Sequence, residues 1–244
     1  MKTTLIIAFV LYAAVTCPAG ELLVLSEEFP PFQYTQDTGR VSGFGIELVT
    51  RIFRDAGIGM AGNKIHIHPW SRTFLMLKTT GNAAAFMTVK NPQRAPMFKW
   101  VGPLAPRAMW LFKLRERKDI TIKTLEQAKA YKIGGYRSAQ TDYLIELGFP
   151  RIQIVDHEAQ NLVLLMAGRV DLVPSLELTM AARLRHMGKS YCDVKKTILF
   201  DGRFDYYLAI NPQTPDAVVA RLQHALDRLK QNQTYDQLMQ RYLN

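Results

Sequence analysis

The sequence predicts an α/β protein folded as two lobes that face each other across a cleft. Short apolar runs typical of strands alternate with amphipathic helical runs from Leu22 onward, and the alternation starts again after Lys118. A long amphipathic segment, Pro215–Lys230, follows and is expected to pack back on the first lobe. This return implies two strands that connect the lobes, near 105–117 and 198–206, and a pair of such strands is a natural hinge.

The first lobe is predicted to consist of residues 20–110 together with 206–244. A helix over 45–56 carries its apolar residues on one face, and Gly57 favours the left-handed backbone of a helix end. Ser71 can cap a second helix that runs to Thr79. The strand predictions of this part of the chain are 22–26, 64–68, 83–89, 108–114 and 206–210.

The second lobe is predicted to consist of residues 111–205. Thr124 and Ser138 stand where they can cap helices, and Gly168 and Gly188 stand where helices can end. The predicted helices are 124–130, 138–147, 158–167 and 177–187. The predicted strands are 132–136, 153–155, 170–173 and 197–200. Because strands and helices alternate, largely parallel sheets are expected in both lobes.

The first nineteen residues have the composition of a secretory signal peptide. Lys2 precedes an apolar run from Leu5 to Val15, and the tail that follows contains small residues that suit a signal peptidase. Cleavage is expected after Ala19, with cleavage after Thr16 as the alternative. No later stretch approaches the roughly 18 apolar residues that a membrane span needs. The mature protein is therefore expected to be exported and soluble.

The chain is basic, with a formal net charge of +10, of which Lys2 contributes one. The basic residues are scattered rather than clustered, and this pattern in an exported protein argues against nucleic acid as a partner. Three interpretations of the charge stay open: an anionic ligand, attraction to an anionic surface, or solubility.

Motifs of catalysis and of metal binding are few. The sequence has no G-x-S-x-G, no H-E-x-x-H and no P-loop, so neither enzyme activity nor a cofactor is expected. His66 and His68 have a spacing that two metal ligands can use, but no third ligand is near in sequence, so a polar strand face without metal is expected. Cys192 is the only cysteine after the signal segment, so no internal disulfide is expected.

Several motifs follow one another along almost the whole chain: FPPFQY with GRVSGFGIEL, PWSR, MTVKNPQR before FKWVGPL, KIGGYRSAQ, AGRVDLVPS and YDQLMQRYLN. In their order and spacing they resemble family 3 of the periplasmic solute-binding proteins, the amino-acid-type receptors of ABC transporters, as a divergent member with a PWxR motif. The resemblance implies the type II periplasmic binding protein fold and a small polar or anionic, amino-acid-like solute in the cleft. It also implies an inner-membrane ABC permease as partner and a monomer in the periplasm.

The resemblance implies four site residues in the first lobe. Phe29 and Trp70 match the aromatic side chains that sandwich the solute. Arg94 matches the arginine that holds the solute carboxylate, a task that suits the planar guanidinium. Thr88 is assigned to the same site, in a segment that is one residue longer than the usual loop of the family.

In the second lobe the resemblance is partial. Arg137 and Ser138 match a helix start whose free N–H groups attract an anion. Leu176 stands where the family has an acidic residue for the amino group of the solute, and a buried ammonium without a carboxylate would cost several kcal/mol. This departure argues against an ordinary α-amino acid, unless Glu177, one residue later, takes the role. Arg72 is predicted as a second anion clamp, the alternative being a solvated cation.

Two other functions stay open at this point. Domains of this kind also serve as ligand sensors, so the chain could be a ligand-sensing partner of a membrane receptor. The same fold also hosts enzymes that resemble cyclohexadienyl dehydratase, in which a cleft carboxyl acts as general acid. Glu177 or Glu47 would fill that role here.

Overall fold

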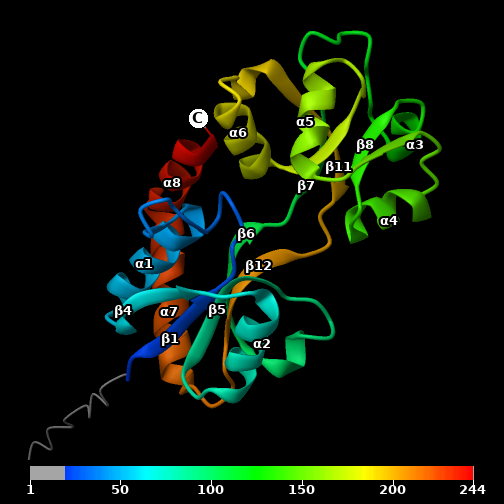
Figure 1. Cartoon of the computed structure of the whole chain (residues 1–244). Helices are drawn as coiled ribbons and strands as arrows, with labels where there is room; N and C mark the ends of the chain where they lie inside the picture. Colours follow the sequence, from blue (N-terminus) through cyan, green and yellow to red (C-terminus); the bar gives the residue numbers. More distant parts are fainter. Residues whose placement is uncertain (1–19, 244) are drawn as a thin grey trace, which may run out of the picture.

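The computed structural model describes residues 20–243. The expected signal peptide, 1–19, lies outside the described residues, as does Asn244. Figure 1 shows two α/β bodies joined by two extended segments, and both ends of the described chain belong to the same body. We call this body the first lobe and the other the second lobe.

Five strands form the sheet of the first lobe, in the spatial order β4 (Met60–Ile67), β1 (Leu22–Ser26), β5 (Ala83–Val89), β12 (Asp205–Ile210) and β6 (Lys99–Pro106). Strand β1 pairs in parallel with β4 and β5, whereas β12 is antiparallel to both of its neighbours. A short hairpin of β2 (Tyr34–Thr35) and β3 (Val41–Ser42) lies beside the sheet. The parallel part of the sheet therefore directs the ends of β1, β4 and β5 to one edge.

Strand β6 is absent from the sequence prediction because Gly102 and Pro103 interrupt its apolar pattern. The structure places β6 at the edge of the sheet. Proline is tolerated there because an edge strand does not need every N–H for pairing.

Four helices cover the sheet of the first lobe: α1 (Phe44–Ala56), α2 (Trp70–Thr79), α7 (Asp216–Gln231) and α8 (Thr234–Leu243). The predicted apolar face of α1 is buried, and Gly57 ends the helix with a left-handed backbone, φ 62°. The predicted cap of α2 is wrong by two residues, because Pro69 occupies the cap position and Ser71 lies inside the first turn. Helix α2 thus begins directly at Trp70.

Gly43 joins α1 to the loop that carries Phe29 and Phe32. Its φ is 123°, and a Cβ at this position would lie 2.5 Å from the Phe32 carbonyl oxygen. We expect Gly43→Ala to lower the free energy of unfolding by more than the roughly 1–3 kcal/mol of such a backbone conformation alone, because the Phe32 backbone must also move. Urea denaturation measures the loss. Gly168→Ala is the control, because Gly168 has φ 65° and open space around its Cβ position; equal losses in the two variants would contradict the clash.

The second lobe contains a three-stranded sheet in the order β10 (Val173–Leu176), β7 (Met109–Leu114) and β11 (Val194–Asp201). All pairs in this sheet are antiparallel, so the expectation of largely parallel sheets is wrong here. The reason is topological: β7 comes from the first lobe and β11 returns to it, so the two run in opposite directions. The strand predicted over 170–173 is placed too early, because β10 begins at Val173 and shares only that residue with the prediction. A parallel pair, β8 (Ile133–Tyr136) and β9 (Ile152–Val155), adjoins through a bridge between Ile133 and Leu172.

The helices of the second lobe are α3 (Leu125–Ala128), α4 (Ala139–Glu146), α5 (Glu158–Met166) and α6 (Glu177–His186). Thr124 caps α3 as predicted, since its hydroxyl accepts from the Gln127 N–H at 3.2 Å. The Ser138 side chain makes no cap hydrogen bond and instead donates to the Tyr136 carbonyl oxygen at 3.3 Å. Within 20–243, no helix is long and apolar enough for a membrane span.

The chain crosses between the lobes twice. It leaves the first lobe between the end of β6 at Pro106 and the start of β7 at Met109, and it returns between Asp201 and Asp205. The two crossings are linked, because Arg107 Nη1 lies 2.9 Å from Asp201 Oδ2. The exact division into lobes at 110/111 and 205/206 stays a prediction.

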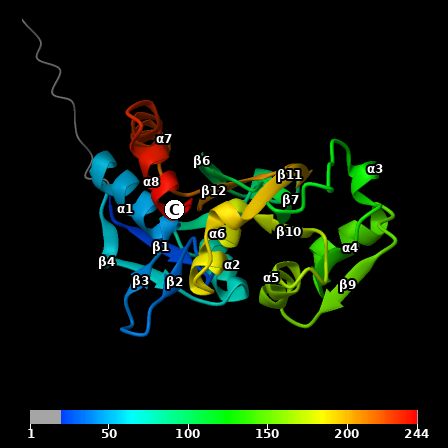
Figure 2. The ribbon, with the colours of Figure 1, turned by 90° about the horizontal axis from the view of Figure 1, so that it is seen from above.

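The lobes also touch away from the crossings. Helix α6 of the second lobe lies beside α8 of the first lobe in Figures 1 and 2. There the Arg185 guanidinium donates to the main-chain oxygen of Tyr242 at 3.3 Å. The distance between the lobes is therefore set by the crossings and by this helix contact together.

Candidate functional site

Four of the predicted site residues come together at one cavity of the first lobe, which we call the head cavity. Its volume is about 210 Å³. Phe29 follows β1, Trp70 begins α2 after β4, and Thr88 lies near the end of β5, so the parallel strands deliver these side chains to one edge. The complete lining is Glu27, Phe29, Trp70, Met87, Thr88, Val89, Arg94 and Tyr206.

Arg94 is the cation of the head cavity. Its guanidinium carbon lies 5.0 Å from the centre of the Trp70 ring and 5.6 Å from that of Phe74. Within residues 20–243 no salt bridge joins Arg94 to a carboxylate. A guanidinium next to aromatic rings and without a carboxylate partner has N–H groups available for a planar anion, and a carboxylate matches the guanidinium in a bidentate pair.

Glu27 shares the head cavity with Arg94. Burial raises the pKa of Glu27 above its usual value, and the nearby charge of Arg94 opposes this shift. Burial likewise lowers the pKa of Arg94, opposed by the charge of Glu27. The cavity is thus partly withdrawn from water, and electrostatic contacts made in it are stronger than on an open surface.

Aromatic rings of Phe29 and Tyr206 also line the head cavity. The Phe29 ring stacks on Phe32 with centroids 4.9 Å apart, and it meets the Tyr206 ring edge-on at 5.8 Å. Tyr206 is buried, and burial raises the pKa of its hydroxyl to about 12, so this group stays protonated and able to donate at neutral pH. These rings offer flat apolar surface to whatever the guanidinium holds.

Met87 has a backbone conformation that is rare for a residue other than glycine. Its φ is 52°, although it lies in β5, and the pairing of β5 with β12 is irregular close by. Such strained backbone is typical of functional sites. The kink occurs where β5 enters the head cavity, just before Thr88, whose buried hydroxyl donates to the Ala85 carbonyl oxygen at 3.1 Å.

A second cavity, the central cavity, adjoins the head cavity and lies between the lobes. It has a volume of about 380 Å³ and shares Phe29 and Tyr206 with the head cavity. From the second lobe, Ser138 lines it at the start of α4, as predicted. Leu176 lines it directly before α6. The other lining residues are Glu28, Pro30, Arg107, Met109, Tyr136, Gln140, Glu158, Thr179 and Arg183.

A comparison with known protein families identifies the family of this chain. A model of bacterial extracellular solute-binding proteins, family 3, matches residues 22–244. The chain belongs to solute-binding family 3. The resemblance predicted from the ordered motifs is thereby confirmed. No curated protein sequence matches the chain.

Solved structures confirm the two-lobed type II fold. Substrate binding domain 2 of GlnP from Lactococcus lactis, in open conformation, is similar with a TM-score of 0.76 and 16% identity over 93% of this chain and 97% of that one. An ancestral cationic amino acid solute binding protein has a TM-score of 0.76 and 16% identity over 92% and 96%. A histidine kinase sensor domain has a TM-score of 0.64 and 19% identity over 93% and 97%. At these identities the likeness shows the fold alone.

Three predicted site residues lie outside both cavities of this family 3 protein. Arg72 and Arg137 are exposed and are absent from the two linings. Glu177 lies 2.8 Å from Lys196 Nζ and accepts a hydrogen bond from the Tyr191 hydroxyl at 2.8 Å. It faces a separate small cavity beside α8. The structure therefore does not bring these three side chains together with Arg94.

The carboxylates that do line the cleft are ones that sequence reasoning missed: Glu27, Glu28 and Glu158. Two of these three carboxylates have hydrogen-bond or ion-pair partners. Glu28 accepts hydrogen bonds from the Thr35 N–H and hydroxyl, and Glu158 pairs with Arg183 at 2.7 Å. Their position directly after β1 and after β9 is the signal that could have found them, because parallel strands end at the cleft.

Neither a metal centre nor the predicted general acids lie in the cleft. The rings of His66 and His68 stack at 6.1 Å, but no group of three or more His, Cys, Asp or Glu side chains suited to a metal occurs among residues 20–243. Glu47 accepts from the Tyr242 hydroxyl at 2.7 Å, at the contact between α1 and α8. Glu47 and Glu177 are thus both held away from the head cavity.

Proposed function

We propose that this family 3 protein captures a small polar or anionic, amino-acid-like solute in the cleft between its lobes and delivers it to an inner-membrane ABC permease. One observation carries the proposal: Arg94 lies over the Trp70 ring, has no salt bridge within residues 20–243, and lines the same cavity as Phe29. A carboxylate on Arg94 places the rest of the solute between the two rings.

Binding is coupled to closure of the lobes. A solute held at Arg94 and Thr88 in the first lobe extends into the central cavity, where Ser138 and Tyr136 of the second lobe face it. Because such a solute gains contacts from both lobes only when they approach, it shifts the equilibrium toward the closed form. The moving parts are the first lobe and the second lobe, and the crossings act as the hinge.

The same proposal includes the cellular location, the oligomeric state and the transporter of the protein. Residues 1–19 direct export, and the mature chain works as a monomer in the periplasm, without nucleic acid or cofactor. The likeness to the second substrate binding domain of a putative amino acid ABC transporter from Streptococcus pneumoniae supports an ABC transporter as the destination.

A second candidate function is a ligand-sensing partner of a membrane receptor. The similarity to a histidine kinase sensor domain favours it. The two functions differ in the partner of the liganded protein. Transport of the solute into vesicles that contain the permease, dependent on the added protein, supports the receptor of a transporter. Solute-dependent binding to a sensor receptor without transport supports the second candidate.

A ligand screen tests the proposed function. The mature protein is heated with amino acids, polyamines, dicarboxylates and aromatic acids in turn, and we expect a rise in Tm with carboxylate-bearing compounds, since a ligand that binds only the folded state stabilises it by mass action. Mass analysis of the mixture should recover the ligand intact. Recovery of a product would establish an enzyme instead, with Glu27, whose pKa is raised by burial, as the first acid to replace.

A further inference from the structure

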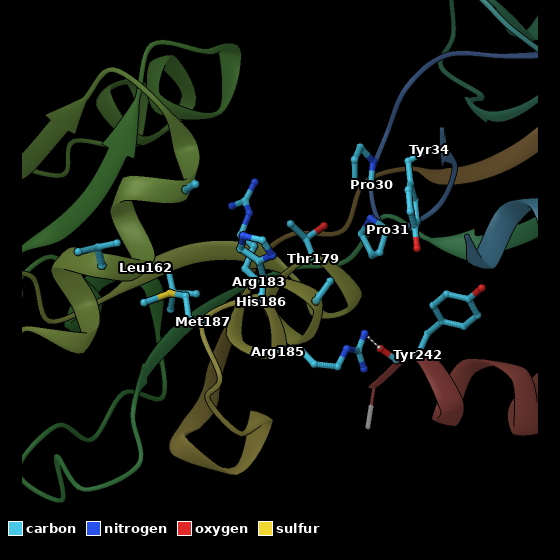
Figure 3. Close-up of a pocket in the computed structure, with 13 residues that line it drawn as sticks. Pro30, Pro31, Tyr34, Leu162, Thr179, Arg183, Arg185, His186, Met187 and Tyr242 are labelled. Carbon is cyan, nitrogen blue, oxygen red and sulfur yellow. Dashed lines mark hydrogen bonds between the residues drawn. The ribbon is translucent and has the colours of Figure 1, made fainter. Parts of the chain in front are cut away.

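A third cavity, the side cavity, lies between the lobes beside the central cavity. Its volume is about 800 Å³. Figure 3 shows Pro30, Pro31, Tyr34 and Tyr242 of the first lobe facing α5 and α6 of the second lobe. Helix α5 contributes Ala159, Leu162 and Val163, α6 contributes Thr179, Ala182, Arg183, Arg185 and His186, and Met187 follows directly after α6. The contact of Arg185 with Tyr242 closes one end of the cavity.

The side cavity adjoins the site of the proposed function. It shares Pro30, Thr179 and Arg183 with the central cavity, and the central cavity shares Phe29 and Tyr206 with the head cavity. A ligand that starts at Arg94 can therefore extend through the central cavity into the side cavity. Pockets of about 300–1,000 Å³ hold drug-sized ligands, whereas the head cavity alone is smaller than this range.

The wall of the side cavity is mainly apolar. Val163 and Met187 are large apolar side chains, yet they are 53% and 38% exposed. No acidic side chain of the described chain lines the cavity, so an ammonium group has no carboxylate there. Two of the cations on the wall are already engaged, Arg183 by Glu158 at 2.7 Å and Arg185 by the main chain of Tyr242.

Part of the lining of the central cavity is apolar, beside the charged side chains of Glu28, Arg107, Glu158 and Arg183. Leu176 and Met109 are both buried, and both face the central cavity. A hydrocarbon or aromatic group can pass along these two side chains without leaving a polar group unpaired.

We propose that the solute is a carboxylate with a bulky apolar substituent, such as an acyl or aryl group, and that this substituent lies in the side cavity. The proposal rests on the proposed function, because Arg94 must hold the carboxylate. It adds the substrate class: the head group is small and anionic, and the tail is apolar and at least several carbon atoms long.

N-acetyl-, N-butanoyl-, N-hexanoyl- and N-octanoylglycine form a suitable test series, because they keep one carboxylate and vary only the tail. Titration calorimetry of the mature protein should show affinity rising by up to about fourfold for each methylene group that becomes buried. Hexylamine and octylamine, which lack the carboxylate, should not bind. Equal binding of the amines and the acylglycines would overturn the proposal, because it would indicate adsorption to apolar surface without Arg94.

A pair of variants locates the tail. Val163→Asp places a charge on the wall of the side cavity and should remove the dependence on tail length while N-acetylglycine binds as before. Ile145→Asp is the matched control, because Ile145 is also an exposed aliphatic side chain on a helix of the second lobe, 56% exposed, but does not line the cavity. It should leave the series unchanged. An unchanged series in Val163→Asp would overturn the proposal.

The outcomes also separate this inference from the proposed function. If affinity is flat across the series while binding of a carboxylate still depends on Arg94, the apolar tail is wrong and the proposed function stands. If no carboxylate in the series or in the ligand screen binds, the proposed function fails and the inference fails with it.

Discussion

Replacement of Arg94 by alanine is expected to reduce the affinity for the solute by about 30-fold to about 5,000-fold. This range corresponds to the roughly 2–5 kcal/mol typical of removing one partner from a buried, hydrogen-bonded charge pair. The guanidinium lies on the Trp70 ring at 5.0 Å in a cavity that is partly withdrawn from water. Its removal leaves the solute carboxylate desolvated without a counter-charge. Titration calorimetry with the ligand from the screen measures the loss.

Two further variants sharpen this result. Arg94→Lys keeps the charge but lacks the planar, forked donors, so its affinity should fall between those of the parent and of Arg94→Ala. Arg72→Ala is the matched control, because Arg72 is an exposed arginine of α2 that does not line the head cavity. Its affinity should equal that of the parent. A loss in Arg72→Ala with none in Arg94→Ala would move the anion site to the outer face of α2.

Replacement of Asp201 by asparagine is expected to lower the free energy of unfolding by about 3–5 kcal/mol at neutral pH, the effect of breaking a buried ion pair. The Asp201 side chain is only 5% exposed. It accepts from Arg203 Nε at 2.9 Å and from Arg107 Nη1 at 2.9 Å, so it joins the two crossings. Without its charge, Arg107 loses its carboxylate partner at the hinge.

The pH dependence of this loss follows from the direction of the pKa shift. Hydrogen bonds from Arg203 and then from Arg107 hold the pKa of Asp201 well below its usual value, against the opposing effect of burial. The stabilisation is therefore present above the unfolded-state pKa, about 3.9, and is lost as the pH falls below it. The difference in free energy of unfolding between parent and variant, measured by urea denaturation, should be constant near neutral pH and shrink in acid.

Asp119→Asn is the control, because it removes an exposed partner of Arg117 and should lower the free energy of unfolding by less. An equally large loss would contradict the role of the hinge.

The part of the site that the sequence predicts is the part that depends on strand ends. The resemblance to family 3 implies Phe29, Trp70 and Thr88 as site residues, and the periodicity of the chain locates the strands that these residues follow or end. The topology then places the side chains together at one edge. Arg94 joins them through the ordered motif that contains it, whereas Glu27, Met87, Val89 and Tyr206 complete the lining without having been predicted.

The parts that the sequence does not predict depend on side-chain direction and on long-range packing. Glu177 and Leu176 are neighbours in sequence, but at the start of α6 the leucine faces the cleft while the glutamate turns to Lys196. Periodicity does not reveal which residue of a helix start faces inward. Tyr206 reaches the head cavity only through the second crossing, and β6 is hidden by its glycine and proline.

The crystal structure of the mature protein with the ligand from the screen tests the central claim most directly. The account predicts solute density in the cleft, with a carboxylate in bidentate contact with Arg94 and the body of the ligand between Phe29 and Trp70. Ligand density outside the head cavity, with the Arg94 guanidinium still facing solvent, would contradict it.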